Sequence, residues 1–186
     1  MFRLCQLLGL LLAVNLSGAE APRLRPAEWA RPVVGASLDN FCQVSAELYR
    51  SEQPDMASLP DLRTFGVQTL LNLRHYHDDA PDFEKGGLAL LHYPMDAGSV
   101  SIPDLVKVLR MFRAAKKPVL VHCWHGSDRT GFVVAGYRIV FMDWTPEQAV
   151  EELRLGGFGY HAATYPNIVR ILKGMDVAAV KKAVLE

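Results

Sequence analysis

The chain has 186 residues, of which 50% are hydrophobic and 22% charged, a composition typical of a globular protein with one well-filled core. Its 20 lysine and arginine residues balance its 20 aspartate and glutamate residues, so the formal net charge is zero. This balance argues against a nucleic-acid-binding surface, and no nucleic-acid partner is expected. A local anion site is still compatible with a neutral protein.

The N-terminal segment has the layout of a secretory signal peptide. One early basic residue, Arg3, precedes an apolar run from about Leu7 to Leu16 that is too short to span a bilayer. Small residues follow, among them Ala19 and Ala21. We therefore expect residues 1–19 to form a signal peptide, with cleavage after Ala19 or Ala21 and no stable membrane insertion afterwards. An uncleaved membrane anchor is the alternative.

Two cysteines are left in the mature chain, Cys42 and Cys123. Two are too few for a disulfide scaffold, even in an oxidising compartment. We interpret Cys123 as a residue kept for its reactivity. Cys42 falls in a predicted strand and is expected to be buried and inert.

A loose arm and then a series of strands are predicted after the signal peptide. Residues 20–40 are rich in proline and arginine and predict the arm, so the folded domain is expected over residues 41–186. Four apolar stretches predict strands, the first of them as a short hairpin or bent strand. These stretches are residues 41–50, 67–73, 88–93 and 118–123.

Helical patterns dominate the second half of the chain. Residues 101–117 place apolar side chains on one face, with Ser101 as the expected cap; these side chains are Leu105, Val108, Leu109 and Phe112. A second helix, apolar on nearly all sides, is predicted to begin near Arg129. Strands come first and helices dominate later, which we interpret as a single α/β domain with a central sheet of about four to five strands flanked by helices.

Three shorter helices complete the prediction. Thr145 and Gln148 form a potential capping box around Pro146, and glycines 156 and 157 are expected to end that helix. Residues 164–174 predict another helix, and the tail from Asp176 predicts a weaker one.

The sequence "HCWHGSDRTG" (residues 122–131) connects a predicted buried strand to a predicted buried helix. Free N–H groups at a helix N-terminus, preceded by a tight loop, form a cradle for an anion. Glycines 126 and 131 permit close backbone approach, and Arg129 can hold two phosphate oxygens with its planar guanidinium. Such surroundings favour a thiolate at Cys123, which would lie beneath a bound phosphate as a nucleophile.

This stretch resembles the Cys-x5-Arg-Ser/Thr signature loop of the cysteine-dependent protein tyrosine phosphatase superfamily, in particular its small dual-specificity branch. The segments "LYRSEQP" (48–54), "FGVQTLLNLR" (65–74) and "GGFGYH" (156–161) resemble further parts of that branch, so the likeness extends over residues 41–171. The resemblance implies a dual-specificity-phosphatase-like fold and no cofactor. His125 is similar to the residue found in secreted bacterial members, which together with the signal peptide implies a periplasmic location.

The resemblance also implies a role for each residue of the signature loop, here residues 123–129, and for its neighbour. Cys123 would form a phosphocysteine, Arg129 would clamp the phosphoryl oxygens, and Thr130 would assist breakdown of the intermediate. The remaining loop residues would bind the phosphate; they are Trp124, His125, Gly126, Ser127 and Asp128. The implied substrate is a phosphorylated protein, with phosphotyrosine preferred over phosphoserine and phosphothreonine. A phosphoinositide or inositol phosphate is the alternative.

A general acid is also needed, because the departing oxygen must receive a proton. Asp96 follows a predicted strand on a loop before the next helix, which matches the place of the acid loop in the family. Asp128 is the rival, since the pattern "CxxGxDRT" is similar to the loops of phosphoinositide phosphatases. We expect Asp96 to be the acid.

Other functions are compatible with parts of the pattern. His75, His77, Asp78 and Asp79 are metal-ligand types, but their position after a strand is better explained by a polar loop, and no metal is expected. A phosphate-binding pseudoenzyme is disfavoured because candidates for nucleophile, clamp and acid are all present. A sulfurtransferase or arsenate reductase is disfavoured because the loop falls late in the chain and Asp96 would have no role.

Overall fold

The computed structural model describes residues 25–186, so the expected signal peptide lies outside the described residues. Six strands form one sheet in the order β1-β2-β3-β6-β4-β5. They are β1 (Arg31–Pro32), β2 (Cys42–Gln43), β3 (Leu48–Ser51), β4 (Thr69–Asn72), β5 (Ala89–His92) and β6 (Val119–His122). The strands β3, β6, β4 and β5 run parallel, and the short β1 and β2 add an antiparallel edge.

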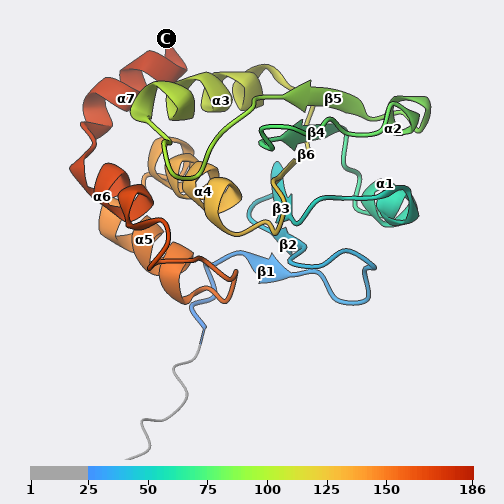
Figure 1. The fold of residues 1–186 in the computed structure, drawn as a ribbon, viewed down its shortest axis with the longest axis horizontal. Coiled ribbons are helices and arrows are strands. Elements are labelled where there is room, and N and C mark those ends of the chain that lie inside the picture. Colours follow the sequence, from blue (N-terminus) through green and yellow to red (C-terminus); the bar gives the residue numbers. More distant parts are fainter. Residues whose placement is uncertain (1–24) are drawn as a thin grey trace, which may run out of the picture.

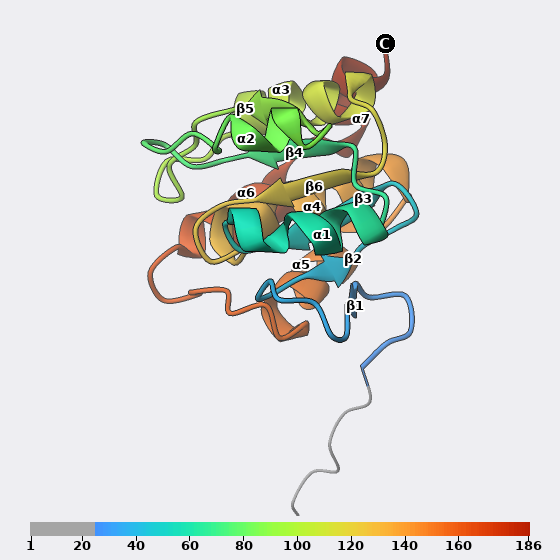
Figure 2. The ribbon, with the colours of Figure 1, turned by 90° about the vertical axis from the view of Figure 1, so that its right-hand side faces the viewer.

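Helices cover both faces of the sheet (Figure 1). The short helices α1 (Leu59–Thr64), which follows the 3-10 turn η1 (Met56–Ser58), and α2 (Asp82–Lys85) lie on one side. The other side carries α3 (Ile102–Ala114), α4 (Asp128–Phe141), α5 (Pro146–Leu155), α6 (Pro166–Gly174) and α7 (Val177–Leu185). Figure 2 views the sheet towards one face, with the strands following one another from β5 at the top to β1 at the bottom, α1 in front of them and α4 and α5 behind. No helix within residues 25–186 has the length and apolar content needed to cross a membrane.

The central strand β6 is buried on both faces. Val119 and Val121 pack with the larger set of helices, whereas Leu120 belongs to the smaller core beside Leu62 of α1 and Phe83 of α2. A parallel strand covered on both sides requires apolar residues at every position, in place of strict alternation. The continuous apolar run before Cys123 is therefore explained by its place at the centre of the sheet.

The predicted helices on the larger face are confirmed. Ser101 accepts a hydrogen bond from the Asp104 amide at the start of α3, and the predicted apolar stripe of this helix is buried. Thr145 and Gln148 form the expected capping box of α5. Nearly every residue of α4 is buried, as its apolar composition on all sides predicts.

The predicted α/β fold is confirmed, although the sheet has six strands where about four to five were predicted. The additional strand, β1, falls inside the segment predicted as a loose arm. It consists of two residues, one of them Pro32, and so carries no periodic pattern that could predict it. The short helices α1 and α2 were not predicted either, because six and four residues are too few to show a helical period.

A buried ion pair holds this arm and two helices together. Arg138 of α4 donates to both carboxylate oxygens of Glu152 of α5, each at 2.8 Å, and both side chains are almost completely buried. Oε1 of Glu152 also accepts a hydrogen bond of 2.6 Å from the backbone N–H of Ala30. The Arg138 guanidinium stacks on Trp144 at 4.3 Å. The pair therefore links the segment before β1 to the helical layer.

Removing one partner of this pair should be costly. We expect Glu152→Ala to lower the free energy of unfolding by about 3–5 kcal/mol, because it leaves the Arg138 charge buried without its counterion. Urea unfolding of both proteins measures the difference. Glu147→Ala, an exposed position in the first turn of the same helix, is the control and should cost less than about 1 kcal/mol. Equal losses in the two variants would contradict the structural role of the pair.

Candidate active site

The signature loop lies at the carboxyl end of β6, between the ends of β3 and β4. Ser51 and Asn72 are the register partners of His122, the last residue of β6. Gly126 has a φ of 69°, and a Cβ at this position would lie 2.3 Å from the carbonyl oxygen of Ser51. Only glycine fits, because both the left-handed conformation and the contact with the β3 backbone exclude a side chain.

The structure brings the predicted nucleophile and clamp together on this loop. Cys123 follows β6 directly and is 2% exposed, and Arg129 occupies the first turn of α4. Nε of Arg129 and Oγ1 of Thr130 are buried and have no hydrogen-bond partner within residues 25–186. Buried polar atoms are normally satisfied. These two atoms are therefore available to oxygens of a bound anion.

Asp96 lies on the loop between β5 and α3 and is exposed. The neighbouring residue Met95 accepts a hydrogen bond of 3.3 Å from Nη1 of Arg129 through its carbonyl oxygen. On the other side, the Ala97 carbonyl accepts a bond of 2.9 Å from Asn167 of α6. The loop that carries Asp96 is thus fixed beside the signature loop. From the described residues, the Asp96 carboxylate accepts only local hydrogen bonds, donated by the Gly98 amide and the Ser99 hydroxyl.

Asp128, the rival acid, is in different surroundings. It is 7% exposed, and both of its carboxylate oxygens contact His161. One accepts the His161 backbone N–H at 2.9 Å, and the other lies 2.9 Å from the Nδ1 atom of the same residue. The Asp128 carboxylate therefore connects the signature loop to the segment 156–161.

The remaining loop side chains differ in exposure. Trp124 is 57% exposed, and the guanidinium of Arg74, at the end of β4, stacks on its ring at 4.2 Å. Partial burial and the nearby positive charge of Arg129 lower the pKa of Arg74. Ser127 is buried, and its hydroxyl donates a long bond of 3.4 Å to the His125 carbonyl. Arg74 and Trp124 form one wall beside the loop.

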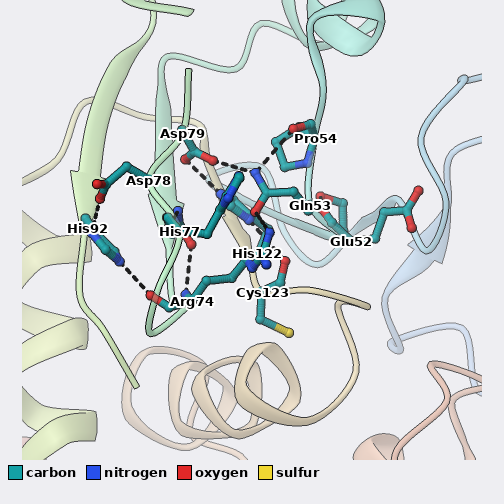
Figure 3. Close-up of polar contacts among 12 residues, drawn as sticks. Glu52, Gln53, Pro54, Arg74, His77, Asp78, Asp79, His92, His122 and Cys123 are labelled. Carbon is teal, nitrogen blue, oxygen red and sulfur yellow. Dashed lines mark hydrogen bonds and ion pairs between the residues drawn. The ribbon is translucent and has the colours of Figure 1, made fainter. Parts of the chain in front are cut away.

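A buried network connects the residue before Cys123 to the loop after β4 (Figure 3). Nε2 of His122 lies 3.0 Å from one Asp79 oxygen, and the other Asp79 oxygen accepts a bond of 2.6 Å from Gln53. Burial alone would raise the pKa of the Asp79 carboxyl group, but the hydrogen bond and charge of His122 and the bond from Gln53 lower it below the usual value. The completely buried His122 side chain is therefore held by a hydrogen bond within the core.

The side chains considered as metal ligands have other contacts. Asp78 pairs with His92 at 2.7 Å, Asp79 contacts His122, and His75 stacks on Tyr76 with ring centroids 4.1 Å apart. Among residues 25–186, no group of three or more histidine, cysteine, aspartate or glutamate residues is arranged to hold a metal ion. The run 74–79 is a polar loop after β4, as the alternative interpretation predicted.

Cys42 is a buried free thiol on β2, and burial raises its pKa. A raised pKa keeps the thiol protonated at neutral pH, which agrees with the predicted inert role. Cys123 is also free, so the two cysteines form no disulfide in the structure.

Three residues whose side chains form hydrogen bonds with the signature loop were not identified as site residues from the sequence. Arg50 donates to the Gly126 carbonyl, Asn40 donates to the His125 carbonyl, and His161 contacts Asp128. Each lies more than 30 positions from its partner along the chain, so no local spacing could reveal the contact. The only signal was the likeness of the segments around Arg50 and His161 to parts of a known family.

Comparison with known proteins gives consistent matches. Residues 36–165 match the model of a family described as the tyrosine phosphatase family. The dual specificity protein phosphatase TpbA of Pseudomonas aeruginosa is 36% identical over 151 residues, which cover 80% of this chain and 68% of TpbA. The crystal structure of P. aeruginosa TpbA in complex with pTyr superposes with a TM-score of 0.78 at 32% identity, covering 88% of this chain and 99% of that one.

Relatives with another named activity also match, over a shorter stretch. The inositol diphosphatase DSP1 of Oryza sativa subsp. japonica is 32% identical over 108 residues, which cover 53% of this chain and 49% of the relative. The catalytic domain of the PP-IP phosphatase SIW14 of Saccharomyces cerevisiae shares the fold, with a TM-score of 0.68 at 22% identity over 78% of this chain and 90% of that one.

The contact between His122 and Asp79 gives a prediction for stability. We expect Asp79→Asn to lower the free energy of unfolding at pH 7 by about 1.5–3 kcal/mol, the typical contribution of a hydrogen bond to a charged group. The difference in unfolding free energy between Asp79→Asn and the wild type should become smaller below about pH 4. A carboxyl group with a lowered pKa contributes its stability above the ordinary value of about 3.9 and loses it as the pH falls towards the folded value.

Urea unfolding between pH 7 and pH 3.5 measures this difference. Asp78→Asn is the control, because its side chain is 86% exposed and its loss should change stability by less than about 0.5 kcal/mol. A difference for Asp79→Asn that stays constant down to the lowest pH would show that its charge does not stabilise the fold.

Proposed function

The chain belongs to the tyrosine phosphatase family, and on this premise we propose that it removes phosphate from phosphotyrosine, and more slowly from phosphoserine and phosphothreonine, through a phosphocysteine intermediate. The proposal rests on the observation that Cys123, Arg129 and the loop with Asp96 lie next to one another. Cys123 and Arg129 lie on one loop, and the Arg129 guanidinium contacts the carbonyl next to Asp96. A nucleophile, an anion clamp and a proton donor therefore surround one site.

In the first step, the Cys123 thiolate attacks the phosphorus atom, and the sulfur–phosphorus bond forms as the bond to the ester oxygen breaks. Arg129 holds the phosphoryl oxygens with its guanidinium, whose Nε has no hydrogen-bond partner in the described part of the chain. Asp96 gives its proton to the departing oxygen, so that a neutral alcohol or phenol leaves.

In the second step, a water molecule attacks the phosphocysteine. The Asp96 carboxylate now takes a proton from that water, the sulfur–phosphorus bond breaks, and inorganic phosphate leaves with the Cys123 thiolate restored. The buried Thr130 hydroxyl, which has no partner among the residues that the structure describes, can donate a hydrogen bond to the departing sulfur. This contact would stabilise the negative charge on the sulfur.

The contacts of the two carboxylates favour Asp96 over Asp128 as the acid. Asp128 has both oxygens occupied by His161, and protonating it would break these bonds. Asp96 is exposed and makes only local contacts, so its proton can reach a leaving group in the mouth of the site.

An inositol phosphate is the second candidate substrate. Arg74 supports it, because no carboxylate within residues 25–186 lies within ion-pair distance of this guanidinium beside the loop. An unneutralised arginine favours a substrate that carries further phosphate groups near the reacting one. The inositol diphosphatase among the relatives agrees with this candidate.

Aryl phosphates with different leaving groups test the mechanism. We expect Cys123→Ser to reduce turnover to background. Asp96→Asn should lower kcat by about 10²–10⁴-fold for phenyl phosphate, whose leaving group needs the proton, and much less for 4-nitrophenyl phosphate. Asp104→Asn, at the start of the following helix, should leave the dependence on the leaving group unchanged. If the Asp96→Asn enzyme hydrolyses phenyl phosphate at the wild-type rate, Asp96 is not the acid and Asp128 becomes the candidate.

A substrate panel distinguishes the two substrate classes. We expect a phosphotyrosine peptide to have a higher kcat/KM than an inositol diphosphate. Arg74→Gln is then expected to lower kcat/KM for the peptide by less than about tenfold. A higher kcat/KM for the inositol diphosphate, together with a fall in kcat/KM in Arg74→Gln for that substrate alone, would instead establish the inositol phosphate as the substrate class. Arg63→Gln, on α1, is the control for a change in total charge.

A further inference from the structure

Three successive carbonyl groups of the signature loop are held by donors from outside the loop. The Trp124 carbonyl accepts the Gln53 backbone N–H at 2.9 Å. The His125 carbonyl accepts Nδ2 of Asn40 at 3.0 Å, and the Gly126 carbonyl accepts Nη2 of Arg50 at 2.6 Å. None of the three bonds is part of a helix or of the strand pairing. They fix the orientation of three neighbouring peptide groups.

Fixing these carbonyls also fixes the amides. In a trans peptide the C=O group and the next residue's N–H point in opposite directions. The N–H groups of His125, Gly126 and Ser127 therefore face away from Gln53, Asn40 and Arg50, into the loop. Within residues 25–186 these three N–H groups donate to no protein acceptor. Successive free N–H groups on one side of a turn make an anion-binding concavity.

Arg50 is an unusual anchor, because it is a buried cation without an ion pair. It lies on β3, is 1% exposed, and stacks on the ring of Phe158 at 3.7 Å. Its Nε atom has no partner, and no carboxylate of the described residues lies within ion-pair distance. Burial lowers its pKa to about 10, and attraction to Cys42, Glu152 and Cys123 opposes this shift. The residue is still charged at neutral pH.

The chain contains a second arginine that is equally buried but neutralised. Arg138 stacks on Trp144 and donates to both oxygens of Glu152. A buried charge without a counterion is costly, and Arg138 avoids this cost through its partner. Arg50 has no such partner and donates instead to the loop. This contrast indicates that the charge of Arg50 is matched by the anion that the loop binds.

Asn40 supports the neighbouring carbonyl of the same loop. Its Nδ2 atom lies 3.0 Å from the His125 carbonyl and 3.0 Å from the Phe158 carbonyl. The residue has a φ of 55°, a left-handed conformation that asparagine adopts more readily than most residues. Asn40 thus connects the signature loop to Phe158, the ring on which Arg50 stacks.

We propose that Arg50 and Asn40 are positioning residues for phosphoryl binding, which hold the Gly126 and His125 carbonyls so that the amides of Ser127 and Gly126 face the bound phosphoryl group. Neither residue touches the substrate. Arg50 in addition places a positive charge behind the loop, where it favours both the Cys123 thiolate and the bound dianion. This inference rests on the proposed phosphatase function, which the turnover of the wild-type enzyme on an aryl phosphate tests separately.

Inhibition by inorganic phosphate tests the proposal in the full chain. Arg50→Met removes the charge and the hydrogen bond while filling the buried space. We expect it to raise the inhibition constant for phosphate at least about tenfold and to lower kcat. Arg50→Lys keeps the charge but loses the planar group and should lie between Arg50→Met and the wild type.

The rate at which iodoacetamide alkylates Cys123, followed by peptide mapping, gives a readout that a purely structural role would not change. In Arg50→Met the rate at pH 6 should fall relative to the rate at pH 9, because the buried charge that favours the thiolate is gone. Arg138→Met combined with Glu152→Gln is the matched control. It also removes a buried arginine, but this ratio and the phosphate inhibition constant should stay within about twofold of the wild type.

Asn40→Gly provides an independent test if Arg50→Met does not fold. Glycine keeps the left-handed backbone and removes only the side-chain amide. We expect weaker inhibition by phosphate, by about threefold to tenfold, with little change in the alkylation ratio. The proposal would be overturned if the wild type is active and a folded Arg50→Met or Asn40→Gly variant keeps the wild-type inhibition constant for phosphate. The proposed phosphatase function would still be supported by the activity of the wild type.

Discussion

The direction of a few peptide groups in the signature loop is the constraint on which the site depends. An anion can be bound by backbone N–H groups only if the carbonyls of the same peptides are satisfied on the opposite side. Gly126 meets this requirement through contact with β3, since its missing Cβ lets the loop lie against the Ser51 backbone. The sheet is therefore part of the site: β3 supplies Arg50 below the loop, and the segment after it supplies the Gln53 amide.

Some buried charged side chains in this protein are paired with a side chain of opposite charge, and others are not. The paired ones stabilise the fold, and the unpaired ones lie at the proposed site. Arg138 and Glu152 neutralise one another and hold the segment before β1 against α5, which is a task of stability. His122 and Asp79 hold the loop after β4 beside the residue that precedes Cys123. Within residues 25–186, the Nε atoms of Arg50 and Arg129 have no hydrogen-bond partner. Both arginines lie beside the signature loop, where a bound phosphoryl group would accept hydrogen bonds from Arg129 and balance the charge of Arg50.

Much of this architecture follows from local sequence, and the exceptions have a physical cause. The stripe of α3, the capping box of α5 and the position of Cys123 and Arg129 at a strand-to-helix turn all depend on residues within about a dozen positions. The contacts of Arg50 with Gly126 and of Asn40 with His125 span 76 and 85 positions. They exist only because β6 is inserted between β3 and β4 in the sheet, an order that no local pattern specifies.

The choice between the two carboxylates shows the same limit in the chemistry. Asp128 is adjacent to Arg129 in sequence, and on spacing alone it is as good a proton donor as Asp96. The two carboxylates differ in their tertiary contacts. His161, in the segment 156–161, contacts both oxygens of Asp128. Contacts with α6 and Arg129 fix the backbone around Asp96 and leave its carboxylate exposed. A carboxylate that anchors the loop must keep its hydrogen bonds throughout the reaction, whereas a proton donor must gain and lose a proton and therefore change its hydrogen bonds. The two tasks are incompatible in one side chain, which is why we propose Asp96, and not Asp128, as the proton donor.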